Sequence, residues 1–149
     1  MNKDVVILIA EDDEGHFALI KKNLVRAGIF NEVVRFADGQ EVLDFLFSKS
    51  RPPAEPRAYL LLLDIRMPKV DGVTVLERLK ADEILKRVPV IILTTTDDPR
   101  EVEHCHGLGC SIYVVKPVEY EDFVEAIRKV GLFLSIVSIP KIGESDLAE

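Results

Sequence analysis

Short, uninterrupted runs of apolar residues alternate along the chain with stretches whose apolar residues recur every three or four positions. The runs have strand length and are rich in branched residues, whereas the spaced stretches are typical of amphipathic helices. The expected strands are 5–10, 32–36, 59–63, 88–93 and 111–115. The expected helices lie at 14–27, around 42–47, at 73–79, after Pro99 and at 119–130. This alternation predicts an α/β fold, with a parallel sheet covered by helices on both faces.

A chain of 149 residues has room for one domain of this type and little for a second. Its apolar content of 48% is enough to bury a core. None of the apolar runs approaches the roughly 20 residues that cross a bilayer, and an acid, Asp4, precedes the first run, unlike a signal peptide. Two cysteines make no disulfide framework. We therefore expect a cytoplasmic protein that has no membrane partner.

The charge balance narrows the choice of partners further. Aspartate and glutamate outnumber lysine and arginine by 26 to 19, which leaves a formal net charge of -7. A general nucleic-acid binder needs a positive face to meet phosphates, so we expect no nucleic-acid partner.

Polar side chains follow most of the expected strands at the point where each strand ends. Taken singly, such residues are usually helix caps or turn residues. The carboxyl ends of parallel strands, however, meet at one edge of the sheet, where open α/β sheets bind their ligands. We therefore expect these side chains to converge in one shallow crevice. They are Glu11, Asp12 and Asp13 after the first strand, Asp64 after the third, Thr94 after the fourth and Lys116 after the fifth.

This set of side chains has a definite chemistry. Clustered carboxylates repel each other unless a cation or a proton joins them, and hard oxygen ligands in a wet site suit Mg²⁺. Thr94 can donate a hydrogen bond to a phosphoryl oxygen, and Lys116 can hold another. Together they predict phosphoryl transfer onto an aspartate, with Asp64 as the nucleophile because it follows the middle strand.

Four stretches, in this order and at this spacing, resemble the receiver domain of two-component response regulators. They are 11–12, 64–72, 89–94 and 113–117. The resemblance runs from residue 5 to about residue 130. It implies a flavodoxin-like (βα)5 three-layer sandwich whose five-stranded parallel sheet has the order 2-1-3-4-5. On this interpretation residues 1–130 form the receiver domain, and residues 131–149 form an extension too short for an effector domain, so that the output is protein–protein contact.

The resemblance also implies roles for the acidic residues. Asp64 resembles the phosphoacceptor, which takes its phosphoryl group from a sensor histidine kinase. Glu11, Asp12 and Asp64, with the backbone carbonyl of Arg66, would bind Mg²⁺ or Mn²⁺. The alternative acidic pair is Asp12 with Asp13. Such a domain catalyses its own phosphorylation and dephosphorylation but is not otherwise an enzyme.

Three further residues match the family pattern, and one departs from it. Thr94 and Lys116 would contact the phosphoryl oxygens. Tyr113 resembles the switch aromatic, whose ring turns inward as Thr94 moves toward the phosphate. Thr95 stands where the family commonly has alanine. A branched side chain there would narrow the approach of water, so we expect slow loss of the phosphoryl group.

Two other functions compete with this interpretation. A haloacid-dehalogenase-type phosphatase also uses an aspartate nucleophile with Mg²⁺, but it needs a second aspartate where Arg66 stands. A pseudo-receiver would bind partners without phosphorylation, which the complete set of acidic, hydroxyl and lysine positions argues against.

The end of the chain carries apolar residues past the last expected helix, from 132 to 139. Such a stretch either folds back on its own domain or forms an interface. We favour a homodimer formed by the helix after Pro99, the strand 111–115, the helix 119–130 and the extension. With the proline-bearing insert 48–57, this tail resembles the small regulators of cyanobacterial and bacterial phytochrome kinases.

One group of histidine and cysteine residues and one single histidine remain. His104, Cys105, His106 and Cys110 lie close enough in sequence to suggest zinc, but a helix would place adjacent residues on different faces, so we expect no metal there. His16 follows the acidic cluster and is either a solvated helix residue, which we favour, or a neighbour that tunes the acidic site.

Overall fold

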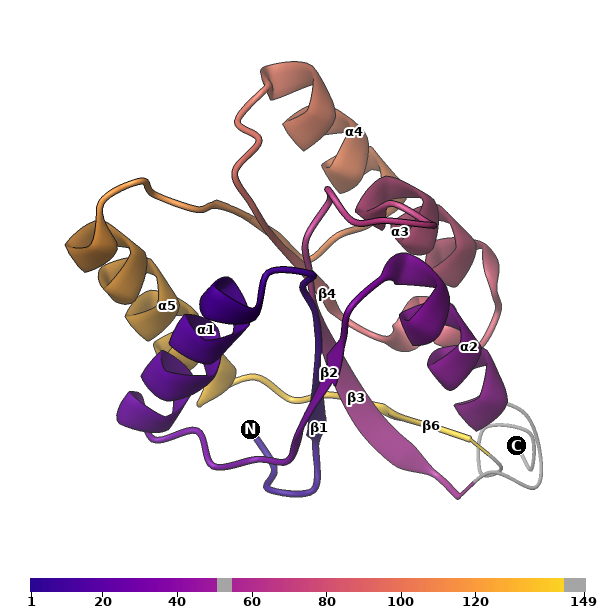
Figure 1. Ribbon diagram of the computed structural model, residues 1–149. Coiled ribbons are helices and arrows are strands. Elements are labelled where there is room, and N and C mark those ends of the chain that lie inside the picture. Colours follow the sequence, from indigo (N-terminus) through magenta and orange to yellow (C-terminus); the bar gives the residue numbers. More distant parts are fainter. Residues whose placement is uncertain (51–54, 144–149) are drawn as a thin grey trace.

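The computed structural model describes residues 1–50 and 55–143, and the expected alternation of strands and helices is present (Figure 1). The main strands are β1 (Val6–Ala10), β2 (Val33–Phe36), β3 (Arg57–Leu63), β4 (Val90–Thr94) and β5 (Ile112–Val115). The helices are α1 (Glu14–Arg26), α2 (Gly39–Lys49), α3 (Gly72–Ala81), α4 (Pro99–Leu108) and α5 (Tyr120–Leu134), with a short 3-10 helix η1 (Leu85–Arg87). The five strands are parallel in the order β2-β1-β3-β4-β5, which confirms the predicted fold class.

Helices cover both faces of the sheet, as Figure 1 shows. One apolar core lies between the sheet and helices α1 and α5, and it includes Ile20, Leu24 and Ile127. The other lies between the sheet and helices α2, α3 and α4, and it includes Leu46 and Leu76. Successive side chains of a strand point to opposite faces, so the central strands feed both cores and must be apolar throughout.

The register of the central strands brings their carboxyl ends to the same level. Ala10, the last residue of β1, pairs with Leu63, the last residue of β3. Glu11 and Asp64 therefore leave the sheet side by side. The chain turns sharply after Asp64, and a side chain at Gly72 would place its Cβ 2.3 Å from the backbone oxygen of Asp64. Glycine at this position lets the start of α3 approach the end of β3.

Helices α1 to α4 each begin at an aspartate whose carboxylate accepts a backbone N–H of the first turn. These residues are Asp13, Asp38, Asp71 and Asp98. Such caps satisfy N–H groups that the helix cannot pair internally. The Asp13 carboxylate accepts from the backbone N–H of His16 at 2.9 Å, so it is already engaged in structure. Several of the aspartates are therefore explained by helix capping and need no role in binding a ligand.

The C-terminal part of the chain differs from the sequence-based prediction. The last helix does not end at Val130 but continues to Leu134, and the chain then crosses to a two-residue strand, β6 (Lys141–Ile142). β6 pairs antiparallel with Arg57 and Ala58 at the start of β3. Ile142 is buried, whereas Ile136 is 82% exposed. The extension thus folds back in part and leaves part of its apolar surface open.

The proline-bearing insert is shorter than predicted, because α2 continues to Lys49 and β3 begins at Arg57. Residues 51–54 lie outside the described part of the chain.

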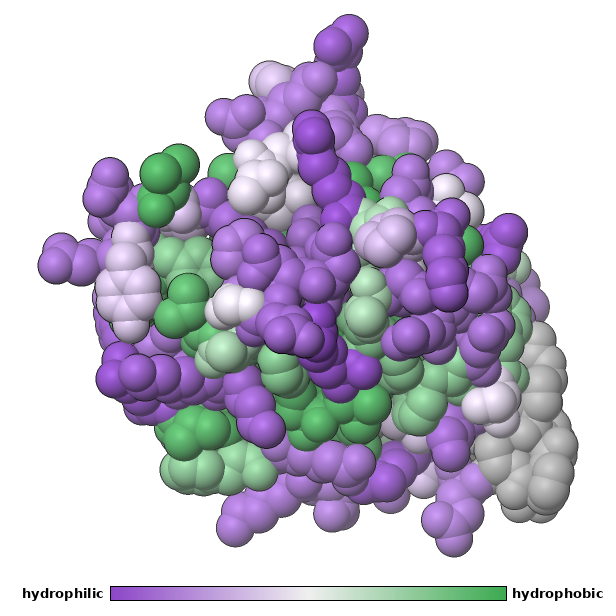
Figure 2. Space-filling model, in the orientation of Figure 1, coloured by the Kyte–Doolittle hydropathy of each residue, from purple (hydrophilic) through white to green (hydrophobic). Residues whose placement is uncertain are grey.

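Hydrophilic side chains cover most of the surface in the view of Figure 2, with apolar patches between them. Among the described residues, no helix is long and apolar enough to cross a membrane.

Candidate functional site at the carboxyl edge of the sheet

Three carboxylates meet where β1 and β3 end. Glu11, Asp12 and Asp64 each offer an oxygen atom, and these atoms lie within 4.8 Å of one another. Glu11 and Asp64 are buried, whereas Asp12 is exposed. This is the acidic pair favoured from the sequence, and Asp13, the alternative member, caps α1 instead. Carboxylate oxygens at this separation can hold a divalent cation such as Mg²⁺ or Mn²⁺, so the donor set fits the expected metal.

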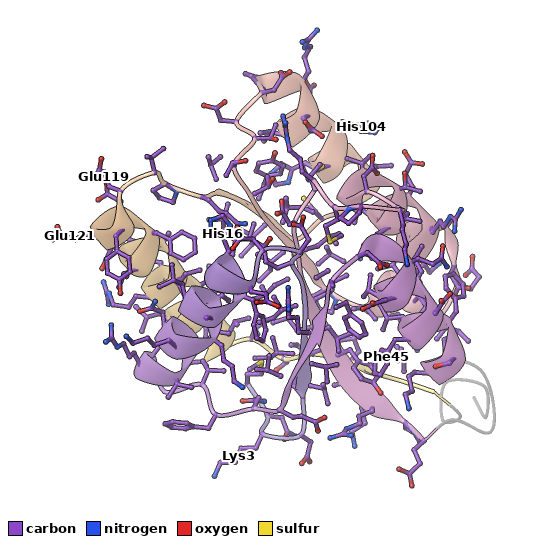
Figure 3. The ribbon with its side chains drawn as sticks, in the orientation of Figure 1. Lys3, His16, Phe45, His104, Glu119 and Glu121 are labelled. Atoms are coloured by element: carbon purple, nitrogen blue, oxygen red, sulfur yellow. The ribbon has the colours of Figure 1, made fainter. Side chains whose placement is uncertain are left out.

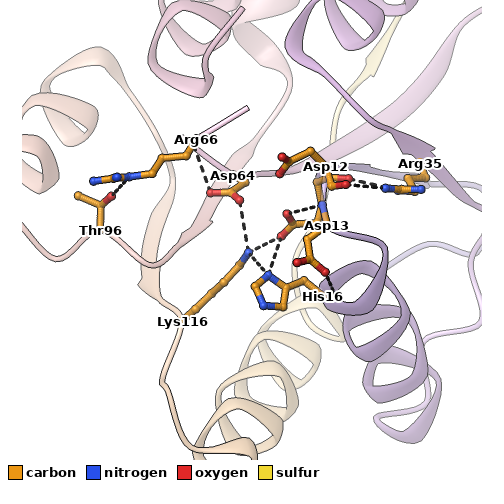
Figure 4. A network of polar contacts seen from close by, with 9 residues as sticks. Asp12, Asp13, His16, Arg35, Asp64, Arg66, Thr96 and Lys116 are labelled. Atoms are coloured by element: carbon orange, nitrogen blue, oxygen red, sulfur yellow. Dashed lines mark hydrogen bonds and ion pairs between the residues drawn. The ribbon is translucent and has the colours of Figure 1, made fainter. Parts of the chain in front are cut away.

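Lys116, the residue after β5, places its ammonium group against this cluster (Figure 4). The Nζ atom donates to Oε1 of Glu11 and lies 3.4 Å from Oδ2 of Asp64. It is also 3.2 Å from Nδ1 of His16. The lysine side chain is almost fully buried, and burial of a charge is tolerated only where partners compensate it. Lys116 therefore offsets the charge of the two buried carboxylates.

Glu11 has an unusual protonation behaviour. Its burial raises the pKa to about 7, although the Lys116 ammonium opposes the rise. The negative charge of Asp64 adds to the effect of burial. Near neutral pH this carboxyl group is thus divided between its neutral form and the ionised form that a cation would stabilise.

Thr94, the last residue of β4, is fully buried at the same edge. Its hydroxyl oxygen is a buried polar atom for which the described residues provide no hydrogen-bond partner. Such an unsatisfied group is uncommon and indicates a place for a ligand atom or a water molecule. The backbone N–H of Lys116 donates to the carbonyl oxygen of Thr94, so the two residues are held next to each other.

Arg66 and Thr96 form a contact that the sequence did not reveal. Nε of Arg66 donates to Oγ1 of Thr96 at 3.1 Å, which joins the loop after β3 to the loop after β4. The backbone N–H of Arg66 lies 3.4 Å from Oδ1 of Asp64. The guanidinium group of this exposed residue is therefore hydrogen-bonded to the neighbouring loop through Nε.

Tyr113 lies on β5 beside the same loop. Its hydroxyl donates to the backbone carbonyl of Thr96 at 2.8 Å, and its ring centroid is 6.5 Å from that of His106 on α4. Burial raises the pKa of the hydroxyl to about 12. Tyr113 thus connects the loop after β4, which carries the site, to the surface formed by α4 and β5.

Arg35 on β2 supports the acidic turn and was missed from the sequence. Its guanidinium donates to the backbone carbonyl oxygens of Glu11 at 3.2 Å and Asp12 at 3.1 Å. It also lies over the ring of Phe17, 5.4 Å from the centroid. A charged residue within an otherwise apolar strand was the only sequence signal. His16 lies in the first turn of α1 (Figure 3) and is partly exposed, as expected, but its Nδ1 also lies 3.2 Å from Nζ of Lys116 (Figure 4).

The histidine and cysteine group of α4 and the turn after it is not among the clusters of described residues that could hold a metal ion. Glu11, Asp12 and Asp64 are the one such cluster in the described part of the chain. Cys110 Sγ lies 3.7 Å from Nδ1 of His106, and His104 is near Glu77. Burial raises the pKa of the Cys105 thiol to about 11, which keeps it protonated and inert.

The arrangement of carboxylates, lysine and threonine can be compared with known proteins. Residues 7–128 match the family model described as the response regulator receiver domain. The chain belongs to the response regulator receiver family.

Individual members of the receiver family support this assignment. Response regulator Rcp1 of Synechocystis is 31% identical over 140 residues, which cover 93% of this chain and 95% of that protein. A receiver domain from Rhodospirillum rubrum has a TM-score of 0.86 and 42% identity, covering 93% of this chain and 99% of that one. The phosphorylated cyanobacterial phytochrome response regulator RcpA has a TM-score of 0.81 and 30% identity, covering 91% and 97%. A crystal structure of Rcp1 is of its Mn²⁺-bound form.

Proposed function

We propose that this receiver domain accepts a phosphoryl group on Asp64 from the phosphohistidine of a sensor histidine kinase. The observation that carries the proposal is the convergence of Asp64 and Lys116 at the end of the central strands, 3.4 Å apart. The unpartnered buried hydroxyl of Thr94 supports it, because that hydroxyl can donate to a phosphoryl oxygen. A crystal structure of RcpA, a relative of similar fold, is of its phosphorylated form.

A divalent cation completes the site in this proposal. Glu11, Asp12 and Asp64 would hold Mg²⁺ or Mn²⁺, together with the backbone carbonyl of Arg66. The acidic cluster and the Mn²⁺-bound form of Rcp1 support this assignment. When bound, the cation neutralises the carboxylates and the charge that develops on the transferred phosphoryl group.

The transfer itself uses residues of this chain. A carboxylate oxygen of Asp64 attacks the phosphorus atom, forming a P–O bond as the P–N bond to the donor imidazole breaks. The bonding electrons leave with the imidazole nitrogen. Lys116 and Thr94 bind the phosphoryl oxygens and stabilise the negative charge that they carry. In dephosphorylation, water attacks the same phosphorus atom, the P–O bond to Asp64 breaks, and inorganic phosphate leaves as the Asp64 carboxylate is regenerated.

The output of the domain would be a change in protein–protein contact. The Tyr113 hydroxyl donates a hydrogen bond to the backbone carbonyl of Thr96, two residues after Thr94. A movement of Thr94 toward the phosphate would therefore be transmitted through Tyr113 to the surface of α4 and β5. We assign the receiver domain to residues 1–130 and a contact role to the extension that follows. The likeness to RcpA, a phytochrome response regulator, supports a phytochrome-type kinase as partner. We propose that the domain acts in the cytoplasm.

We also propose that the domain forms a homodimer. Its interface would consist of α4, β5, α5 and the C-terminal extension. Exposed apolar residues support this, since Leu132 is 51% and Phe133 37% exposed at the end of α5. Light scattering coupled to size-exclusion chromatography tests it over a concentration series, comparing the wild type with Phe133→Asp. Val25→Asp, at an exposed apolar position on α1, is the matched control. A wild type that stays monomeric throughout would contradict the dimer.

Phosphorylation is tested by incubating the protein with acetyl phosphate and Mg²⁺, followed by intact mass and Phos-tag electrophoresis. We expect a single base-labile adduct that is lost in Asp64→Asn. Asp13→Asn is the matched control, because Asp13 caps α1 and should leave the adduct in place. A wild type that is never modified would favour the pseudo-receiver, and turnover of a generic phosphomonoester would favour the phosphatase.

A further inference from the structure

The ammonium group of Lys116 has three N–H donors and meets three acceptors. Two are the carboxylates of Glu11 and Asp64, which belong to the metal and phosphoryl site. The third is Nδ1 of His16, at 3.2 Å, which comes from the first turn of α1 (Figure 4). Because an ammonium nitrogen can only donate, a hydrogen bond between Nζ and Nδ1 requires Nδ1 to be the acceptor, which only the neutral imidazole allows. Its proton is then on Nε2.

Two further contacts support this arrangement, one through the backbone of His16 and one through its ring. The backbone N–H of His16 donates to Oδ1 of Asp13, which fixes the first turn of α1. The imidazole ring also stacks on Phe123 of α5, with centroids 6.3 Å apart and planes 28° apart. Phe123 is buried in the core between α1 and α5. The ring is thus supported from α1 and from α5, although its side chain is 41% exposed.

We infer that His16 is a positioning residue for Lys116, a role that rests on the phosphoacceptor function proposed above. The carboxylate partners of Lys116 change when the site is used, since a cation draws on Glu11 and a phosphoryl group covers Asp64. His16, as a neutral acceptor, would keep its hydrogen bond to Lys116 when the cation and the phosphoryl group bind. It anchors one N–H of Lys116 and leaves the other two free to turn to phosphoryl oxygens. Without this acceptor, each phosphoryl transfer would bear the entropy cost of ordering the flexible lysine side chain.

The test compares two substitutions at position 16. His16→Phe keeps a ring against Phe123 but removes the acceptor, whereas His16→Gln restores an acceptor oxygen. We expect His16→Phe to lower the maximal rate of phosphorylation by acetyl phosphate at saturating Mg²⁺ by about tenfold, the loss of one charge-assisted hydrogen bond. His16→Gln should recover most of that rate. His104→Phe, on α4, is the matched control and should behave as the wild type.

A direct measurement separates this inference from the proposed function. ¹⁵N NMR of the lysine ammonium groups, assigned with Lys116→Arg, should show a Lys116 signal that is protected from water exchange. The protection should fall in His16→Phe and not in His104→Phe. A Lys116 signal and a phosphorylation rate both unchanged in His16→Phe would overturn the inference, as would equal losses in His16→Phe and His16→Gln. A wild type that is not phosphorylated would overturn the proposed function, while the ammonium signal would still decide the contact.

Discussion

Arg35 of β2 donates from Nη2 to the backbone carbonyl oxygen of Asp12 at 3.1 Å, and so holds the turn that presents the acidic cluster. Its Nε donates to the carbonyl of Glu11 in the same way. We predict that Arg35→Gln weakens Mg²⁺ binding about fivefold, because about 1 kcal/mol of hydrogen bonding no longer orders the turn. Isothermal titration calorimetry measures the affinity. Arg57→Gln, at the opposite end of the sheet, is the control, and equal affinities in the two variants would contradict this role.

Mg²⁺ binding should depend on pH through Glu11. Burial raises the pKa of this carboxyl group to about 7, and the cation binds the ionised form. Affinity should therefore be full well above pH 7 and should fall below it, toward about tenfold per pH unit, as a proton competes for the carboxylate. Calorimetric titrations between pH 6 and 8 test this. Glu11→Gln should bind more weakly but with little pH dependence over that range, and an equally steep dependence in this variant would contradict the assignment.

The parts of the fold that could be predicted are those governed by local pattern. Continuous apolar runs predicted the five main strands. Because the carboxyl ends of parallel strands meet at one edge, the sequence also predicted that Glu11, Asp64 and Lys116 meet. The strand order came from the family resemblance, since no local pattern carries it. The two-residue strand β6 has no periodicity to detect. The contacts of Arg35 and of Arg66 join residues 24 and 30 positions apart, and depend on side-chain reach across the folded edge.

The end of α5 shows how packing can override a local signal. The sequence-based prediction ends this helix at Val130, its last regularly spaced apolar residue, and the next residue, Gly131, is of the type often found just beyond a helix end. In the structure the helix continues, because Gly131 packs against α1, where an added Cβ would lie 2.5 Å from Cβ of Ala27. The glycine is there for close approach of two helices.

This close approach predicts opposite effects for two glycine substitutions. Gly131→Ala should destabilise the protein by about 1 kcal/mol, since overpacking of about 1–3 kcal/mol outweighs the better helix propensity of alanine. Gly107→Ala, in α4 with open space around the new Cβ, should stabilise by up to about 1 kcal/mol. Urea denaturation of both variants measures the free energy of unfolding. Stabilisation by Gly131→Ala would show that α1 and α5 are not in contact at this point.

The folded-back part of the extension should contribute to stability. Ile142 in β6 is buried in the core beside β3, so Ile142→Ala should cost about 2–4 kcal/mol in the free energy of unfolding. Ile136→Ala, at a position that is 82% exposed, should change it by no more than about 0.5 kcal/mol. Thermal and urea denaturation compare the two. Equal, small effects would mean that β6 does not pack on the domain in solution.

The lifetime of the phosphorylated state should depend on Thr95. This residue is exposed and directly follows Thr94, so we expect its side chain to lie where water approaches Asp64. Thr95→Ala removes a branched side chain, so we predict that dephosphorylation accelerates severalfold. Thr95→Val keeps the shape while removing the hydroxyl, and should retain the slow rate if bulk, rather than hydrogen bonding, restricts water. Decay of the adduct after removal of acetyl phosphate, followed by Phos-tag electrophoresis, measures the three rates. If Thr95→Ala decays as slowly as the wild type, the side chain does not control the access of water.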